Sequence, residues 1–470
     1  MPTQYLICEE RSQVYPSEAE AMAQGLTRQL AGYLYPLLVQ LDRQLDKRLV
    51  RTFAQLIAVI LTFRDRINGL LLTELAEQMG PASQAPAAVK RISNLLHSPK
   101  WSAQLLTEYL WERAEHQMQQ WEQQQEDALV IWDSSVLEKP ESTHNDDYCA
   151  VRSSKAARLT RIKPGYYNPP RGPVFVPGLH WIGVLLVGSR QSQGPPQIAA
   201  MRWWTSRGRR ASYERDEEGK LLVELVARWG RRVLHVFDRG FAGAFWLKLL
   251  VAFQVRFVMR WPTTWYLLTA PGQKRKTWQM GLGKRGWEER SVWDSRRGQW
   301  VRSSVLAVPV RHPDLPEVPL WLVICRSQGR APWYLLTNEP IAQARDVWRI
   351  AFAYARRWQI ELTWRYDKSE FAFQSPRLWF WSEREKLLLM ATLAYDFLLS
   401  LMQPWQEPVR IWCLRTYCHR TGAHLRRVRL PLTRLRKALS RLWQEHPLAW
   451  HLLGPPAAAR DPPLQLALTC

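Results

Sequence analysis

The sequence is poor in cysteine and lacks a long uninterrupted apolar run. Six cysteines in 470 residues lie far apart, so no disulfide framework is expected, which fits a reducing cytosol. The longest apolar run, 387–402, is interrupted by Asp396 and is too short to span a bilayer, so we expect a buried helix. The N-terminus shows no basic-then-apolar signal peptide. Together these absences favour a cytoplasmic protein without a membrane partner.

Acidic residues are also scarce, since 42 Asp and Glu face 65 Lys and Arg, for a net charge of +23. Residues 1–126 hold 12 basic and 14 acidic residues, so all of the excess lies after Glu126. Residues 401–470 alone carry 11 basic and 3 acidic residues. Such a charge favours nucleic acid or an anionic membrane as partner, and nucleic acid is preferred without a membrane segment. A basic but otherwise ordinary soluble protein is the alternative.

The organisation of the chain begins with a helical region. At 46% hydrophobic residues the chain is not wholly disordered, and its length suggests roughly two to four domains. Residues 17–126 show helical periodicity, with a helix at 72–79, a Gly80-Pro81 break and a helix at 87–97. The second helix carries Lys90 and Arg91, so the pair is either a DNA-reading helix-turn-helix or part of a plain bundle.

After Asp127 the pattern changes to alternating strands and helices, which indicates a mixed α/β domain. We expect strands at 128–133, 180–188, 197–205, 233–238 and 255–260, and helices at 213–229 and 242–253. Residues 261–340 are basic, rich in tryptophan and punctuated by glycine, which predicts a β-rich insertion. One long helix, 341–373, and helices at 383–403 and 431–445 complete the prediction.

Two of the apolar runs end in a carboxylate, Asp133 and Asp238. Functional groups converge at strand ends in α/β sheets, which makes both residues candidates. Asp133 is the less certain one because other acids lie near it, although they occupy polar segments: Asp127, Glu138, Glu141, Asp146 and Asp147.

The long helix carries one carboxylate among cations. At 100° per residue, Arg357, Glu361, Arg365 and Lys368 all fall within about 60° of Tyr354. A solvated charged face with one internal ion pair is the alternative. Three carboxylates could hold two divalent metal ions that act on a phosphodiester, while Arg and Lys bind the phosphates.

The spacing Y-x2-R-x3-E-x6-K of Tyr354, Arg357, Glu361 and Lys368 resembles the signature of bacterial cut-and-paste transposases of the insertion sequence four type. These belong to the RNase H-like DDE superfamily, and Asp238-Arg239-Gly240-Phe241 is similar to their second-Asp motif. The resemblance spans about residues 128–375. It implies an α+β chain whose catalytic core is RNase H-like, mixed α/β and interrupted by a β-rich insertion, with helical N- and C-terminal regions.

The resemblance also implies roles for the residues. Asp133, Asp238 and Glu361 would ligate Mg²⁺ or Mn²⁺ and cut the strands at terminal inverted repeats, before the 3′-hydroxyl joins target DNA. Tyr354, Arg357, Lys368, Arg365 and Arg239 would contact DNA. Trp333 lies 28 residues before Glu361, as does a family tryptophan that stacks on a flipped base; a core tryptophan is the alternative.

The same resemblance divides the chain into five parts. These are a helical DNA-binding domain 1–126 with Lys90 and Arg91, the first core part 127–260, the insertion 261–340, the second core part 341–382 and a basic helical region 383–470. A homodimer would pair two ends of double-stranded DNA in the bacterial cytoplasm, at the nucleoid when bound.

Three alternatives remain open. The chain could be a domesticated sequence-specific DNA-binding protein, or an RNase H-like nuclease without strand transfer. Separately, Cys413, Cys418, His419 and His424 could be a zinc knuckle, but their spacing fits no standard pattern, and two core thiols on a helix is the alternative.

Overall fold

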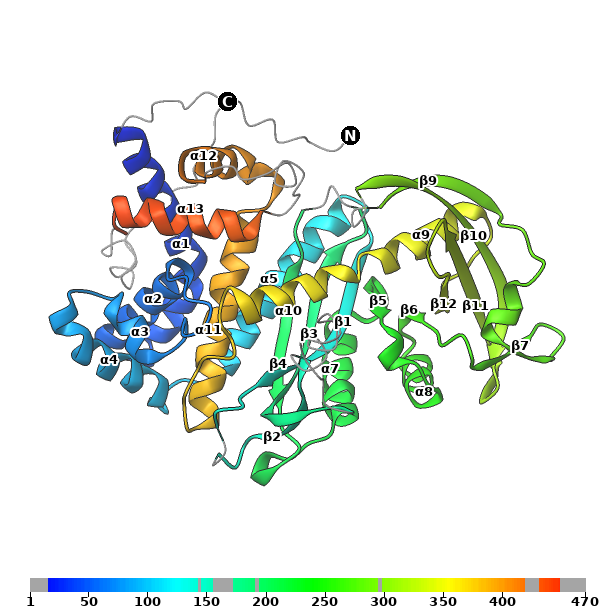
Figure 1. The fold of residues 1–470 in the computed structure, drawn as a ribbon, viewed down its shortest axis with the longest axis horizontal. Coiled ribbons are helices and arrows are strands. Elements are labelled where there is room, and N and C mark those ends of the chain that lie inside the picture. Colours follow the sequence, from blue (N-terminus) through cyan, green and yellow to red (C-terminus); the bar gives the residue numbers. More distant parts are fainter. Residues whose placement is uncertain are drawn as a thin grey trace, which may run out of the picture. The chain divides into compact units, whose positions relative to one another are not determined.

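The computed structural model describes residues 16–142, 145–154, 172–190, 194–294, 298–418 and 431–448. The chain divides into two compact units, one of Met1–Glu112 with Tyr366–Cys470 and one of Arg113–Arg365. In its described residues the first unit is built from helices, and the second from one large mixed sheet with helices against it (Figure 1). The expected combination of a mixed α/β core with helical N- and C-terminal parts is confirmed, and the sheet is consistent with an RNase H-like core.

The sheet unit has twelve strands among its described residues, in the order β2-β3-β1-β5-β6-β12-β11-β10-β7-β8, with β4 on β3 and β9 on β10. The strands are β1 (Ala128–Glu138), β2 (Cys149–Arg152), β3 (Phe175–Gly188), β4 (Gln197–Trp204), β5 (Val233–Phe237), β6 (Arg256–Arg260), β7 (Tyr266–Thr269), β8 (Lys274–Lys276), β9 (Glu288–Asp294), β10 (Gln299–His312), β11 (Leu315–Ser327) and β12 (Trp333–Thr337). Each of the five predicted core strands is present, but β1 and β3 are longer than predicted, and β2 was not predicted.

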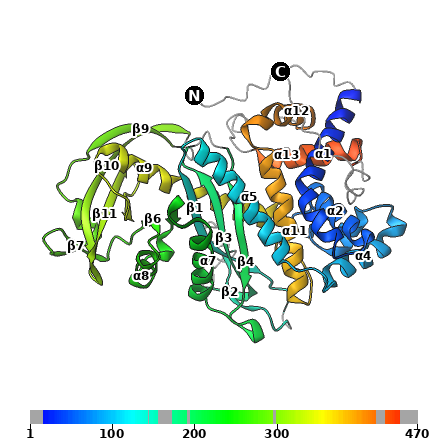
Figure 2. The same ribbon diagram turned by 180° about the vertical axis from the view of Figure 1, so that it is seen from behind.

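The centre of the sheet is parallel, because β1 pairs with β5 and β5 with β6 in the same direction, whereas β3 and β4 run antiparallel. Every residue of β5 is buried, which explains why its sequence is apolar except for His235, whose Nδ1 accepts the Trp132 indole N–H at 3.0 Å. Helix α10 (Trp358–Ser369) crosses one face of the sheet, and α7 (Glu214–Trp229) lies on the opposite face (Figures 1 and 2). Helix α8 (Ala244–Ala252) connects β5 to β6.

The insertion is β-rich, as predicted, but it is not a separate sheet. Strand β12 pairs antiparallel with β6, from Leu335 opposite Arg260 to Thr337 opposite Val258. Strands β7 to β12 therefore extend the core sheet beyond β6, and α9 (Ala344–Ala355) packs on β10, β11 and β6. The residues that open and close the insertion are thus held next to the core strands.

The prediction of one helix from 341 to 373 is wrong, because α9 and α10 are separate. Between them the backbone turns more tightly than an α-helix. The amide of Arg357 donates to the carbonyl of Tyr354 at 3.0 Å, and the amide of Ile360 donates to that of Arg357 at 3.2 Å. These bonds span three residues rather than four, as in a 3₁₀ turn.

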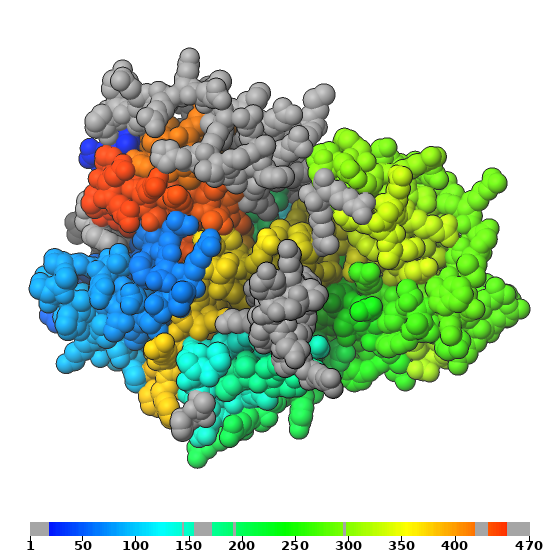
Figure 3. All heavy atoms as spheres, viewed as in Figure 1, coloured from blue at the N-terminus to red at the C-terminus, as the bar shows by residue number. Residues whose placement is uncertain are grey.

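The helical unit contains α1 (Pro16–Asp42), α2 (Lys47–Thr62), α3 (Leu72–Glu77), α4 (Ala85–His97), α11 (Trp381–Ser400), α12 (Glu407–Tyr417) and α13 (Leu432–Glu445). The sequence pattern predicts separate regions at 1–126 and 383–470, but the structure packs 1–112 and 366–470 into this one unit. Tyr33 donates its hydroxyl to Asp396 at 2.9 Å, and α13 lies against α2, as the surface view also shows (Figure 3). The unit boundaries fall inside α5 (Gln104–Gln123) and α10.

The apolar run 387–402 belongs to α11, which is buried along most of its length, as predicted. In the described part of the chain no single helix is long and apolar enough to cross a membrane. Residues Trp381–Ser400 and Pro404–Tyr417 meet those limits only as a pair bent by 76°.

The helix, break and helix at 72–97 are confirmed as α3, a short 3₁₀ turn (Ala82–Gln84) and α4. Helix α4 buries its apolar face, and Lys90 is exposed on it while Arg91 is partly exposed. In the region of the suggested zinc knuckle, Cys413 is buried on α12 and Cys418 follows that helix, whereas His419 and His424 lie outside the described residues.

Candidate active site

The parallel pairing of β1 and β5 brings Asp133 and Asp238 to matching positions. The last pair of that register is Ile131 with Val236, and each aspartate lies two residues further along its strand. Asp238 follows β5, as predicted, and accepts the amide of Gly240 at 2.6 Å. Asp133 does not end its strand, contrary to the prediction, because β1 continues to Glu138 in antiparallel pairing with β3.

Asp133 is held by two donors and lies among other charges. The indole nitrogen of Trp364 donates to Oδ2 at 3.1 Å, and the amide of Ser134 donates to Oδ1 at 3.1 Å. Burial and the nearby charge of Asp238 raise the pKa of Asp133 to about 7, and Glu361 adds to this rise while Arg357 opposes it. Asp133 therefore lies close enough to both Asp238 and Glu361 for their charges to act on it.

Trp364 stands on α10 three residues after Glu361 and sets the distance between α10 and the sheet. Its ring lies over Gly183 of β3, the residue paired with Asp133. A Cβ at Gly183 would meet the Trp364 ring at 2.1 Å, so only glycine permits this approach. The ring centroid also lies 4.1 Å from that of Trp181. This packing positions the helix that carries Glu361 against Asp133.

The turn between α9 and α10 gathers the remaining polar groups. Arg357 forms an ion pair with Glu361, and both side chains are partly buried. Burial alone lowers the pKa of Arg357, but the neighbouring Tyr354 and the carboxylates outweigh it and raise the pKa. The ring of Trp333 lies 5.2 Å from that of Tyr354, edge to face. Tyr354, Arg357, Glu361 and Trp333 thus form one cluster, which holds three of the four residues of the Y-R-E-K pattern; no contact places Lys368 in it.

Three contributors were missed by the sequence analysis. Arg260, the last residue of β6, lies near the side chain of Tyr354, and its charge opposes the rise in the pKa of Tyr354 that burial causes. Arg215 bridges the buried Glu218 at 2.7 Å and the carbonyl of Gly240 at 3.1 Å, so it supports the turn that holds Asp238. Trp364 is the third. Two of these residues have a signal in the sequence. Arg260 is a charged residue at the end of a predicted strand, and Arg215 stands three residues before Glu218 on a predicted helix, but neither pattern is specific for a site.

Other candidates lie away from this cluster or have other partners. Arg239 is exposed in the 3₁₀ turn after Asp238, Arg365 is exposed on α10, and Lys368 lies in the last turn of α10 beyond the unit boundary. Lys90 and Arg91 belong to the helical unit. Among the rival acids, Glu138 binds Ser153 and Ser154, and Asp127 lies near Arg256 and Arg349. Asp133 is therefore the acid that faces Asp238.

The cluster fits a divalent cation in its chemistry. Carboxylate oxygens are the ligands that Mg²⁺ and Mn²⁺ prefer, and a cation would relieve the repulsion that raises the pKa of Asp133. In the structure, however, Glu361 is turned to Arg357. Within the described ranges, no three Asp, Glu, His or Cys side chains stand close enough together to hold a metal ion as they are.

No protein-family model matches the sequence, and no curated protein matches it. Among solved structures, the chain is similar to a piggyBac transposase synaptic complex with hairpin DNA, determined by cryo-EM. The TM-score is 0.40 at 9% identity, over 94% of this chain and 84% of that chain. A likeness of this degree assigns no family, so the case for a function rests on the residues of the site.

Proposed function

We propose that the chain is a DDE-type DNA transposase that cuts and pastes an insertion sequence. One observation carries the proposal. Asp133 on β1 and Asp238 directly after the parallel strand β5 lie within electrostatic reach of each other, and Asp133 is also within reach of Glu361 on α10, which belongs to the Y-R-E-K pattern. A packed core has little use for a buried carboxylate such as Asp133 with two others nearby, because it costs free energy to desolvate.

The residues of the cluster have distinct roles in this proposal. Asp133, Asp238 and Glu361 hold Mg²⁺ or Mn²⁺, which when bound activates the attacking oxygen and stabilises the leaving oxygen. Arg357 releases Glu361 and binds a phosphate instead, for which its planar guanidinium is suited. Arg260 and Tyr354 orient the same phosphate, and the exposed Arg239 and Arg365, with Lys368, contact the backbone further along.

Trp333 is proposed to stack on a base that leaves the duplex. Its ring is partly exposed at the start of β12 and borders Tyr354, so a base received there would lie beside the phosphate-binding groups. Helix α4, with Lys90 and Arg91, is proposed to read the terminal inverted repeats. A homodimer would pair the two ends and join them to target DNA in the bacterial cytoplasm.

The test is cleavage of a duplex that ends in the inverted repeats of the element, with Mg²⁺ present. Glu361→Gln keeps the shape of the side chain but removes its charge, and we expect the rate to fall at least about 100-fold. Glu289→Gln is the matched control, since Glu289 is an exposed carboxylate of the same unit, paired with Arg302. Equal cleavage by Glu361→Gln and wild type would refute the assigned triad.

A DNA-binding protein without catalysis is the second candidate. The Arg357–Glu361 ion pair favours it, because Glu361 is then part of a structural pair and not a metal ligand. Complete absence of Mg²⁺-dependent cleavage by the wild-type chain, with specific binding retained, would establish it. A pre-cut 3′-hydroxyl end would further separate a transposase, which joins it to target DNA, from a nuclease, which does not.

A further inference from the structure

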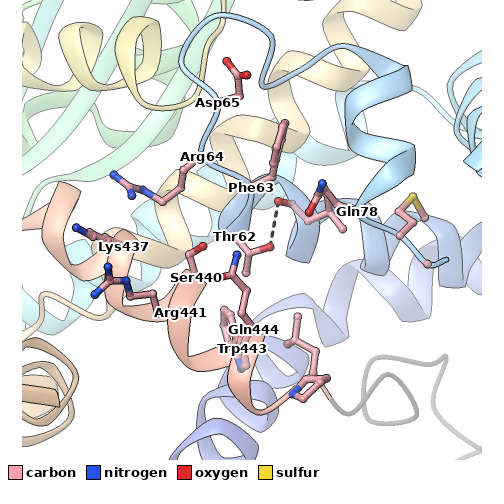
Figure 4. Close-up of a pocket in the computed structure, with 15 residues that line it drawn as sticks. Thr62, Phe63, Arg64, Asp65, Gln78, Lys437, Ser440, Arg441, Trp443 and Gln444 are labelled. Atoms are coloured by element: carbon pink, nitrogen blue, oxygen red, sulfur yellow. Dashed lines mark hydrogen bonds between the residues drawn. The ribbon is translucent and has the colours of Figure 1, made fainter. Parts of the chain in front are cut away.

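The helical unit contains a pocket of about 760 Å³ that the proposed chemistry does not use. It lies between the end of α2, the segment after α3 and one side of α13. Arg64, Lys437 and Arg441 line it, together with Phe63 and Trp443, and the three cations gather on one side of the view (Figure 4). We call this the α13 pocket.

The α13 pocket concentrates positive charge. Arg64, Lys437 and Arg441 all line the pocket, and these three cations, together with Arg434, lie near enough to the Cys418 thiol to oppose the rise of its pKa that burial causes. Nε of Arg64 and Nη2 of Arg434 are buried and have no hydrogen-bond partner among the described residues. Like charges at this density repel, and unpaired buried donors cost free energy, so the arrangement favours an anion.

Neighbouring acids neutralise only part of this charge. Asp65 lines the pocket, but it accepts the amides of Ile67 at 2.7 Å and Asn68 at 2.9 Å, which hold the turn after α2. Glu370 lies 3.7 Å from Arg64 and also pairs with Arg66. For Lys437 and Arg441, no carboxylate of the described residues stands within ion-pair distance.

The walls of the pocket are fixed by a buried guanidinium. Arg436 of α13 donates to the carbonyls of Leu61 at 2.9 Å, Ile60 at 2.7 Å and Phe63 at 2.6 Å. These are the free carbonyls at the C-terminus of α2, where a cation is favoured. Arg436 therefore locks α13 onto α2, and the cations of both elements are placed before any ligand arrives.

We propose that the α13 pocket holds a backbone phosphate of bound DNA, gripped by Arg64, Lys437 and Arg441. The inference rests on the proposed function, because DNA is the polyanion that a transposase must bind. Charge complementarity supports the same occupant, since residues 401–470 carry 11 basic and 3 acidic residues. Such a contact positions the helical unit on the duplex and carries no sequence information by itself.

The test measures binding of the full-length chain to a generic duplex in EDTA, by fluorescence anisotropy over a series of salt concentrations. Each lost phosphate contact makes the slope of log K against log salt shallower by about 0.9. We expect the double variant Lys437→Ala, Arg441→Ala to lower the affinity about tenfold or more and to flatten the slope by about 2. A slope equal to that of the wild type would overturn the proposal.

The matched control is Arg28→Ala, Lys100→Ala, which removes the same charge from exposed residues of the same unit outside the pocket. If the slope of log K against log salt flattened equally in this control, the effect would be one of total charge, and the proposal for the pocket would be overturned. A second readout uses only wild-type protein: amine acetylation of Lys437 is expected to be blocked by DNA, and that of Lys100 is not. Acetylation of Lys437 unaffected by DNA would also overturn the proposal.

These experiments distinguish a failure of the pocket from a failure of the proposed function. They also distinguish a DNA phosphate from a free phosphate ion. Binding in EDTA does not depend on the carboxylate cluster, so a pocket variant that binds like wild type refutes the pocket alone. A wild-type chain that binds no duplex refutes the proposed function as well. Protection of Lys437 by inorganic phosphate but not by the duplex would assign the pocket to a free anion and overturn the DNA occupant.

Discussion

At the scale of single residues, Asp133 obtains its character from its neighbours. Its carboxylate accepts a hydrogen bond from the indole N–H of Trp364, and the negative charges of Asp238 and Glu361 act on it. The hydrogen bond from Trp364 alone joins two residues that are 231 positions apart in the sequence. The apolar run before Asp133 indicated which acid to choose, whereas the value of its pKa follows only from the fold.

Trp364→Phe should weaken the site without unfolding it. Phenylalanine keeps an aromatic ring over Gly183 but loses the N–H that orients Oδ2 of Asp133. Loss of such a supporting hydrogen bond typically costs 10- to 100-fold in metal affinity, so we expect the Mg²⁺ concentration for half-maximal cleavage to rise by about that factor. Trp300→Phe, at an exposed tryptophan, is the control. An unchanged Mg²⁺ requirement would contradict the positioning role.

Asp133→Asn should change how stability depends on pH. The pKa of Asp133 is about 7 in the folded chain against an ordinary value of 3.8, so the folded state keeps a proton that the unfolded state releases. Wild-type stability therefore falls as pH rises from about 4 to 7, by up to about 1.4 kcal/mol per pKa unit. Asparagine does not titrate, and the variant should exceed wild type in thermal midpoint at pH 8 but not at pH 4, measured in EDTA. A constant difference across this range would contradict the raised pKa.

At the scale of elements, the position of α10 over the sheet decides whether a site exists. The Y-R-E-K spacing assumed one continuous helix, yet the chain turns tightly at Arg357 and begins α10 at Trp358. Arg357 still lies near both Tyr354 and Glu361, because only three and four residues of the tight turn and of α10 separate them. The close approach over Gly183 then brings the start of α10 to Asp133.

Gly183→Ala should disrupt this approach. The added Cβ would lie 2.1 Å from the ring of Trp364 and 2.9 Å from the sulfur of Met201, so α10 must shift. Overpacking of this kind costs about 1–3 kcal/mol, and we expect cleavage to fall with the displacement of Glu361. Gly219→Ala is the control, because Gly219 lies in α7 with open space at its Cβ and should tolerate or gain from alanine. Full activity of Gly183→Ala would show that α10 does not need this distance.

At the scale of the whole molecule, the two ends of the chain build one helical unit around α11. Tyr33 donates to Asp396, and Lys386 donates to the carbonyl of Leu96 at 2.9 Å, so N-terminal helices share their core with a helix more than 280 residues later. From Leu387 onward α11 is apolar on nearly all sides, because other helices surround it. The N-terminal region is therefore not an independent domain in its packing.

A fragment of residues 1–126 should fail to fold alone. Without α11, the apolar faces of α2 and α4 are left in water, and α2 alone has ten buried residues. We expect no cooperative thermal transition by circular dichroism for the fragment, and recovery of one when residues 366–470 are co-expressed with it. Cooperative unfolding of the isolated fragment would contradict the shared core.

Sequence reasoning determined the elements and the chemistry whose signals are local. Apolar runs located the core strands, and the helical spacing brought Tyr354, Arg357 and Glu361 together, because both patterns follow from backbone geometry over a few residues. The basic C-terminal region was also visible in composition, although its pocket was not. Those signals sufficed for the mixed α/β class and for the central candidates of the site.

Only the tertiary structure decided what depends on contacts between distant segments. It continued β1 beyond Asp133, joined the insertion to the core sheet through β12, and merged the two helical ends into one unit. It also added Arg260, Trp364 and the α13 pocket, whose cations come from segments more than 370 residues apart. Such contacts leave no periodic mark in the sequence, because burial and charge pairing are set by which surfaces meet when the chain folds.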